Sequence, residues 1–215
     1  MKAKLVSNIK HVHIIHTCFL LFMISCNNYS SVSIANQIWM NENLSVTKYS
    51  NGDEIFQAKT MDDLNMAEKE HMGAWCYIDD EGDVTITENK YGKLYNWFAV
   101  SDPRGLCPKG WHVPNILEYE NLVEHLGGVQ QALKLLKSNK SWVDNGTNET
   151  GFSAVPTSNE GYASYWTATD APPFGLGNSR NKDNAYSFRI EENYIYKDGT
   201  YSKKWPMAVR CVKGY

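Results

Sequence analysis

The chain has 215 residues, a length that suits one domain with a sizeable hydrophobic core. Hydrophobic residues make up 42% of it and charged residues 21%, which is typical of a globular protein. A net charge of −3 and a pI near 6.1 argue against a nucleic-acid partner, because such partners favour a basic face. The aromatic content of 13% fits both a β-rich extracytoplasmic domain and a carbohydrate binder, so composition does not separate the two.

The N-terminus predicts a targeting segment. Three lysines precede the apolar run Thr17–Ile24, which is too short to cross a bilayer, a span of about 20 residues, but suits the core of a signal peptide. The run ends in Met23-Ile24-Ser25-Cys26, which resembles a bacterial lipobox. We therefore expect residues 1–25 to be a lipoprotein signal peptide and Cys26 to be lipidated. An ordinary secretory peptide, or an uncleaved anchor, is the alternative.

A lipid on Cys26 would attach the protein to the outer membrane, on its periplasmic or its cell-surface face. The polar segment Asn27–Ala35 predicts, together with Cys26, a short tether over residues 26–35. The folded domain is then expected over residues 36–215, and no second apolar stretch of the sequence is long enough for a transmembrane helix.

Short elements are expected in the first half of the domain. Asn51-Gly52-Asp53 and Asp79–Asp83 are turn sequences, and the aromatic segment Tyr95–Val100 is expected to be buried. The predicted elements around them are a strand within Ile38–Val46, a short helix at Met61–Glu70 and a strand at Trp75–Ile78.

Two helices are predicted in the middle of the chain. Asn115 can cap the first one, and Glu118 stands three residues on, where a capping box requires it. Gly127-Gly128 is expected to end this helix through left-handed backbone geometry. A second helix follows, because apolar side chains recur at helical spacing at Val129, Ala132, Leu133 and Leu136.

The rest of the chain predicts strands and one long loop. The loop is Asp170–Asn184, rich in Pro, Gly and Asn. The expected strands are Thr150–Val155, Tyr162–Thr169, Tyr186–Ile190, a hairpin of Tyr194–Tyr196 with Thr200–Trp205 across Lys197-Asp198-Gly199, and a closing strand at Met207–Val212. This order predicts the α+β class, with two helices packed on short antiparallel sheets and a long late loop.

Five motifs carry a family resemblance. They are Gln37–Leu44 (QIWMNENL), Tyr91–Pro114 (YGKLYNWFAVSDPRGLCPKGWHVP), Asn148–Ala154 (NETGFSA), Tyr165–Thr169 (YWTAT) and Val209–Val212 (VRCV). In this order, over roughly residues 36–213, they resemble the Fibrobacter succinogenes major paralogous domain family, which occurs in secreted and lipid-anchored bacterial proteins. The family name records paralogy and no reaction, so it names no ligand.

The resemblance implies a single C-type lectin-like domain, and the predicted order of elements is compatible with one. Of five cysteines, only Cys76, Cys107 and Cys211 lie in the domain, so at most one bridge forms within it. We favour Cys107–Cys211, which would join the helical region to the last strand much as the long disulfide of C-type lectin-like domains does. Cys76 would then be a buried free thiol, and Cys76–Cys107 is the competing pairing.

The late loop is where C-type lectin-like domains carry their ligand loop, so the resemblance implies recognition of a glycan or a cell-envelope protein there. The candidate ligand-binding residues are Tyr162, Tyr165, Phe174 and Arg180, with Trp166 as a further aromatic platform. The alternative is that Tyr165 and Trp166 belong to the core and that the loop is merely long.

No metal or other cofactor is expected. The Glu-Pro-Asn, Gln-Pro-Asp and Trp-Asn-Asp motifs of calcium-dependent sugar-binding lectins are missing from the sequence. The acidic residues of Asp79–Asp83 offer oxygen atoms that calcium prefers but lack the spacing of a calcium loop, so a solvated turn is expected.

The sequence also favours a protein without enzymatic activity. His112 has no nucleophile or carboxylate partner in a recognisable motif, and the common hydrolase and nucleotide-binding motifs are missing. We therefore expect a non-enzymatic, lipid-anchored cell-envelope or surface protein that binds a glycan or an envelope protein. The alternatives are a structural or adhesive accessory subunit of a surface assembly, and a hydrolase whose site would need two carboxylates converging near His112.

Overall fold

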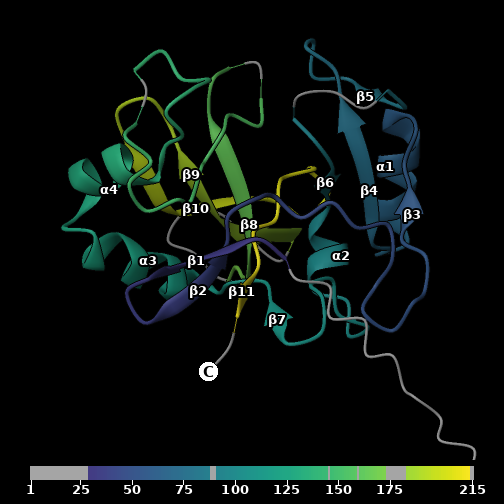
Figure 1. Cartoon of the computed structure of the whole chain (residues 1–215). Helices are drawn as coiled ribbons and strands as arrows, with labels where there is room; N and C mark the ends of the chain where they lie inside the picture. Colours follow the sequence, from purple (N-terminus) through teal and green to yellow (C-terminus); the bar gives the residue numbers. More distant parts are fainter. Residues whose placement is uncertain (1–28, 88–90, 145, 159, 173–182, 214–215) are drawn as a thin grey trace, which may run out of the picture.

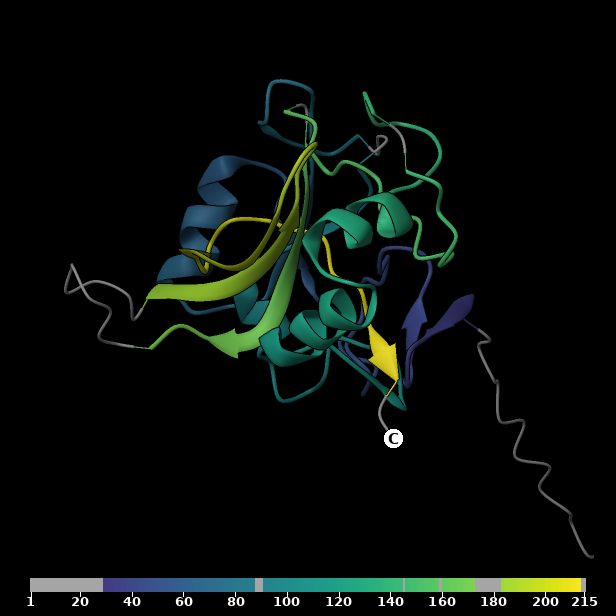
Figure 2. The same cartoon turned by 90° about the vertical axis from the view of Figure 1, so that its left-hand side faces the viewer.

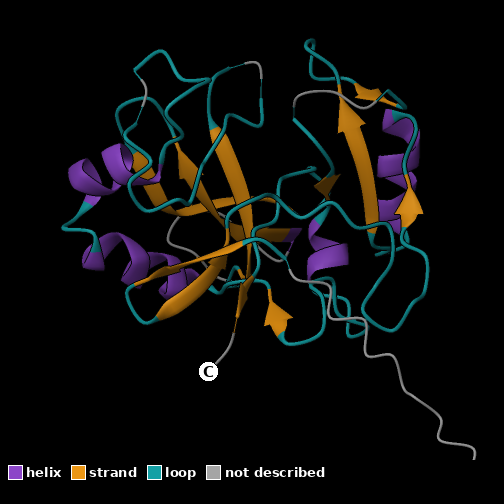
Figure 3. Cartoon of the chain, viewed as in Figure 1, coloured by secondary structure: helices purple, strands orange, loops and turns teal. Residues whose placement is uncertain are grey.

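The computed structural model describes residues 29–87, 91–144, 146–158, 160–172 and 183–213. Within these ranges the chain forms three small sheets and four helices, which confirms the predicted α+β class (Figures 1 and 3). No helix in the described ranges is long and apolar enough to cross a membrane. The predicted signal peptide, Cys26, Phe174 and Arg180 lie outside the described residues.

The first sheet joins the two ends of the domain. Its strand order is β1-β2-β11-β7, and all of its pairings are antiparallel. The bounds are Ser31–Ile34 for β1, Gln37–Met40 for β2, Val212–Lys213 for β11 and Trp111–His112 for β7.

Strand β1 corrects the predicted tether. Residues 31–34 are paired with β2, whereas the sequence predicts that they belong to the short tether over residues 26–35. Val32 and Ile34 alternate with serines and pack against the hydrophobic core, and this burial outweighs the polar composition of the segment. The ordered domain therefore begins before residue 36.

The second sheet contains β8 (Ala163–Asp170), β9 (Asn184–Ile190) and β10 (Ile195–Ser202), in the order β10-β9-β8. Its two faces have different partners. The face that carries Tyr165, Phe188 and Ile190 belongs to the core cluster that also includes buried residues of α3 (Ile116–His125) and α4 (Val129–Leu136). Figure 2 shows these two helices on one side of the sheet and α1 (Met61–Lys69) on the other.

Strand β10 replaces the predicted hairpin. The turn expected at Lys197-Asp198-Gly199 does not form, because residues 195–202 run as one strand that pairs with β9. The register shifts between Tyr196 and Gly199, so the turn-like sequence is accommodated as an irregularity of the strand.

The strand predicted at Thr150–Val155 is also wrong. Ser153 there has a positive φ angle of 57°, and Ala154 makes only an isolated bridge.

The helices follow their local signals. Asn115 and Glu118 form the predicted capping box at the start of α3, and Gly127 and Gly128 both have φ of 89° after its end. Helix α1 is also present, and it begins with a capping box of Thr60 and Asp63 that the sequence analysis did not identify.

The third sheet and two helices form the other side of the domain. The sheet has the order β3-β4-β5, and β6 pairs with β4. The bounds are Phe56–Gln57 for β3, Ala74–Ile78 for β4, Val84–Thr85 for β5 and Leu94–Tyr95 for β6, and the short helix α2 spans Trp97–Val100.

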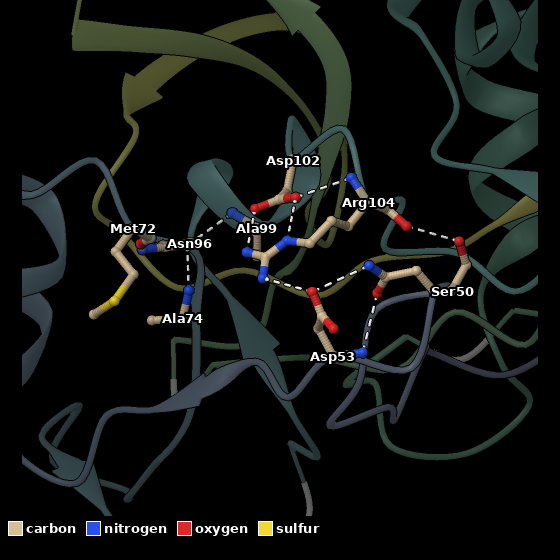
Figure 4. Close-up of polar contacts among 9 residues, drawn as sticks. Ser50, Asp53, Met72, Ala74, Asn96, Ala99, Asp102 and Arg104 are labelled. Atoms are coloured by element: carbon tan, nitrogen blue, oxygen red, sulfur yellow. Dashed lines mark hydrogen bonds and ion pairs between the residues drawn. The ribbon is translucent and has the colours of Figure 1, made fainter.

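The buried side chain of Asn96 fixes α2 against β4 (Figure 4). Its Oδ1 accepts hydrogen bonds from the backbone N–H groups of Ala74, at 2.9 Å, and Ala99, at 3.0 Å, while its Nδ2 donates to the carbonyl of Met72 at 2.9 Å. Because all three bonds are made to backbone, Asn96 sets the position of the helix and is unavailable to a ligand.

A second polar cluster, also shown in Figure 4, surrounds Arg104. Its guanidinium donates to Asp102 with both Nε, at 2.9 Å, and Nη2, at 2.7 Å, and it reaches Asp53 across the 49–53 turn. The guanidinium also lies 4.1 Å from the centre of the Tyr49 ring. These contacts join two surface loops and thereby stabilise the chain segment that leads to Cys107.

A disulfide joins Cys107 to Cys211, which confirms the favoured pairing, and Cys76 is a buried free thiol. The bridge links the segment before β7 to the residue directly before β11. It therefore connects the helical region to the closing strand.

Replacing Cys107 and Cys211 together by alanine is expected to lower the free energy of unfolding by roughly 4–5 kcal/mol, because the bridge limits the entropy of an unfolded chain across a separation of 104 residues. Urea denaturation monitored by tryptophan fluorescence measures this. Cys76→Ala is the control, since it removes a buried thiol without opening a loop. A double variant as stable as the control would contradict the prediction.

Candidate ligand-binding groove

A groove of about 410 Å³ lies between the second and third sheets. One wall comes from the β4–β5 hairpin and α1, the opposite wall from the segment leading into β8, and the remaining side from β9, β10 and the residues after β10. In the same order, the lining residues are Met61, Ile78, Glu81, Gly82 and Val84, then Thr157, Ser158, Glu160, Tyr162 and Ser164, then Arg189, Tyr201, Trp205, Pro206 and Met207.

The register of the second sheet explains why polar side chains line this groove. Ser164 of β8 pairs with Arg189 of β9, which in turn pairs with Tyr196 of β10. Neighbours in register share one face of a sheet, and adjacent residues along a strand point to opposite faces. Because Phe188 and Ile190 on either side of Arg189 are buried in the core, Arg189 points away from α3.

Arg189 is surrounded by tyrosine rings. The carbon of its guanidinium lies 4.8 Å from the ring centre of Tyr162, 5.0 Å from that of Tyr196 and 5.6 Å from that of Tyr201. Its Nη2 forms an ion pair with Glu191. Its Nε is buried and has no hydrogen-bond partner among the residues the structure describes.

Tyr162 stands where the sequence analysis predicted a binding residue. Its side chain is half-buried in the groove wall, and the Ser158 hydroxyl next to it donates to the Tyr162 carbonyl at 3.2 Å. Burial and the neighbouring carboxylate of Glu160 raise the pKa of the Tyr162 phenol. The phenol is therefore a neutral hydrogen-bonding group at physiological pH.

Two other aromatic predictions are corrected by burial. Tyr165 and Trp166 are both fully buried, so neither ring offers a face to a ligand. Trp166 instead donates its indole N–H to the carbonyl of Tyr95 at 2.9 Å, which ties β8 to β6. Of the four predicted binding residues, the structure therefore brings only Tyr162 to the groove, since Phe174 and Arg180 lie outside the described residues.

Sequence reasoning missed Arg189, Tyr201 and Trp205. The alternation within Tyr186–Ile190 was a usable signal, because it places Arg189 on the face opposite Phe188. Tyr201 was missed because the predicted hairpin paired Thr200–Trp205 with Tyr194–Tyr196, whereas in the structure Tyr201 pairs with Ala185 of β9.

The remaining candidates for chemistry serve local structure. His112 Nε2 lies 2.8 Å from Glu118 Oε1, and the other carboxylate oxygen of Glu118 accepts from the backbone of Asn115 at the cap of α3. Neither His112 nor Glu118 lines the groove. In the Asp79–Asp83 turn, Asp79 accepts from the backbone N–H groups of Glu81 and Asp83. No group of three or more metal-binding side chains occurs within the described ranges.

The chain matches the family model described as Fibrobacter succinogenes major domain over residues 32–213, and it therefore belongs to this family. No curated protein and no solved structure matches it. The name of the family specifies no reaction and no ligand.

Cys76 lies in β4 and is not a nucleophile. Its side chain is fully buried, and burial raises the pKa of the thiol to about 12. Since an unfolded cysteine titrates near about 8.5, the folded state holds the proton between these values. The thiol therefore stabilises the fold at and below about pH 8.5, and this contribution decreases as the pH rises further.

Alkylation of Cys76 with iodoacetamide near pH 8 is expected to be slower by orders of magnitude in the native protein than in urea, because the thiolate is the reactive form. Mass spectrometry of the peptide that contains Cys76 measures the rate without interference from other cysteines. Equal rates in native and denaturing buffer would show that Cys76 is accessible and ionised.

Proposed function

We propose that this protein is a non-enzymatic, lipid-anchored component of the cell envelope or cell surface whose groove binds a glycan. The observation that carries the proposal is the lining of the groove, where aromatic rings stand beside carboxylates and hydroxyl groups. We further propose that the domain is C-type lectin-like, which the Cys107–Cys211 bridge between the helical region and the closing strand supports. The lipobox-like sequence ending at Cys26 supports the anchor at the outer membrane.

The lining suits a sugar for two separate chemical reasons. A pyranose ring has apolar C–H faces, which pack on flat aromatic side chains, and Trp205 keeps 45% of its surface exposed at the edge of the groove. A pyranose ring also has hydroxyl groups around its rim. Glu81 and Glu160 can accept hydrogen bonds from these hydroxyls, and the phenol of Tyr201 can donate one.

Recognition of this kind needs no calcium. The groove offers two carboxylates, Glu81 and Glu160, and they come from opposite walls. Calcium sites take six to eight oxygen ligands, about three to four times the number that these two side chains supply if each gives one oxygen. Sugar binding in this groove is therefore proposed to proceed through stacking and direct hydrogen bonds.

Trp205→Ala is expected to weaken glycan binding by about tenfold or more, because it removes the most exposed aromatic face of the groove. The purified protein would first be screened against an array of polysaccharides, and the affinity for the best one then measured by calorimetry with and without EDTA. The wild-type affinity is expected to be the same in both buffers.

Leu117→Ala is the matched control for this experiment. Leu117 is also a large apolar residue, exposed to 62% on α3, but it does not line the groove. It should bind like the wild type. A blank array would contradict glycan binding and favour an envelope-protein ligand or a structural role, to be followed by crosslinking in the native envelope. Loss of binding in EDTA would contradict the calcium-independent site.

A further inference from the structure

An aromatic surface continues from the groove beyond its mouth. Arg189, which lines the groove, contacts the ring of Tyr196 at 5.0 Å, and the Tyr196 ring lies edge-on to that of Tyr194 with 4.9 Å between centres. Tyr194 and Tyr196 do not line the cavity itself. They stay exposed to 50% and 39%, so both rings are accessible to a ligand.

The fold holds these two tyrosines in place. Tyr194 closes the turn between β9 and β10, where its carbonyl accepts a hydrogen bond from the N–H of Glu191 at 2.8 Å. Tyr196 pairs with Arg189 in the register of the sheet. We call Trp205, Tyr201, Tyr162, Tyr196 and Tyr194 the aromatic row: the first three line the groove, Tyr196 stands on β10, and Tyr194 stands on the turn before it.

The charges beside this row favour an uncharged ligand. Arg189 is already paired with Glu191, and Lys204, which lies over the Trp205 ring, is paired with Glu68. Glu81 and Glu160 line the groove from opposite walls. An acidic polysaccharide would meet two carboxylates and cations that already have partners, so like-charge repulsion would oppose its binding.

We propose that the ligand is an uncharged glycan chain that runs out of the groove along Arg189 and rests on the Tyr194–Tyr196 pair. This inference rests on the proposed function and adds to it the class of glycan. A single sugar or a disaccharide would fill the groove and leave the outer pair unused. A longer chain would contact both, and its affinity would therefore increase with length.

The test compares short and long ligands of the same chemistry. Cellobiose and cellohexaose, mannobiose and mannohexaose, and xylobiose and xylohexaose would each be titrated into the wild-type protein by calorimetry. In at least one series we expect the hexasaccharide to bind about tenfold tighter than the disaccharide. Polygalacturonate is expected not to compete with it.

Tyr194→Ala and Tyr196→Ala are each expected to reduce the hexasaccharide affinity by about three- to tenfold and to leave the disaccharide affinity unchanged. Tyr196→Phe is the matched control, because it keeps the ring that stacks and removes only the hydroxyl. The midpoint of urea unfolding of each variant shows that the fold is intact.

The possible results distinguish the uncharged-chain inference from the proposed glycan binding itself. Equal affinities for short and long chains, competition by polygalacturonate, or an equal effect of Tyr196→Ala on both lengths would overturn the uncharged-chain inference while glycan binding stands. If no series binds and polysaccharide arrays stay blank as well, the proposed function itself fails.

Discussion

The rest of this domain depends on the hydrogen bonds of one buried guanidinium group, that of Arg210. Arg210 is only 1% exposed, yet in the described structure its hydrogen-bond partners are all uncharged. Its Nε and Nη2 donate to the amide oxygen of Asn43, while Nη1 donates to the carbonyls of Met40 and Phe152. The Phe152 and Tyr165 rings lie 4.5 and 5.5 Å from it. A buried cation is costly unless its donors are satisfied, so these segments have to assemble together.

This arrangement explains why five separate motifs occur in the chain. Four of them supply Arg210 itself or groups that contact it, and the fifth supplies Cys107, which is bonded to the residue directly after Arg210. Tyr165 then anchors the core face of β8, whose other face presents Ser164 to the groove. By contrast, Arg189, Tyr196 and Trp205 lie outside the motifs. The motifs thus build the scaffold, and the residues proposed to contact a glycan lie between them.

A feature was predictable from the sequence where the residues that determine it lie close together in the chain. The cap of α3 at Asn115 and Glu118 was predictable because both partners lie within one helical turn, and the cysteine arithmetic left few pairings to choose between. Strand β10 was not, since the turn propensity of Lys197–Gly199 is local whereas the pairing that overrides it runs along β9. The groove was missed for the same reason. Tyr162, Arg189 and Tyr201 are distant in sequence and come together only through strand register.

The measurement that tests this account most directly is a double-mutant cycle between Arg210 and Asn43, read as the free energy of unfolding in urea. Arg210→Met is expected to cost about 3–5 kcal/mol, because it leaves the buried acceptors around it unpaired. Asn43→Ala removes the oxygen atom that accepts hydrogen bonds from both Nε and Nη2 of Arg210, so it is also expected to destabilise the fold. The double variant should lose less than the sum, with a coupling of about 0.5–3 kcal/mol. Additive losses, or an Arg210→Met protein as stable as the wild type, would contradict the claim that Arg210 joins the motifs into one core.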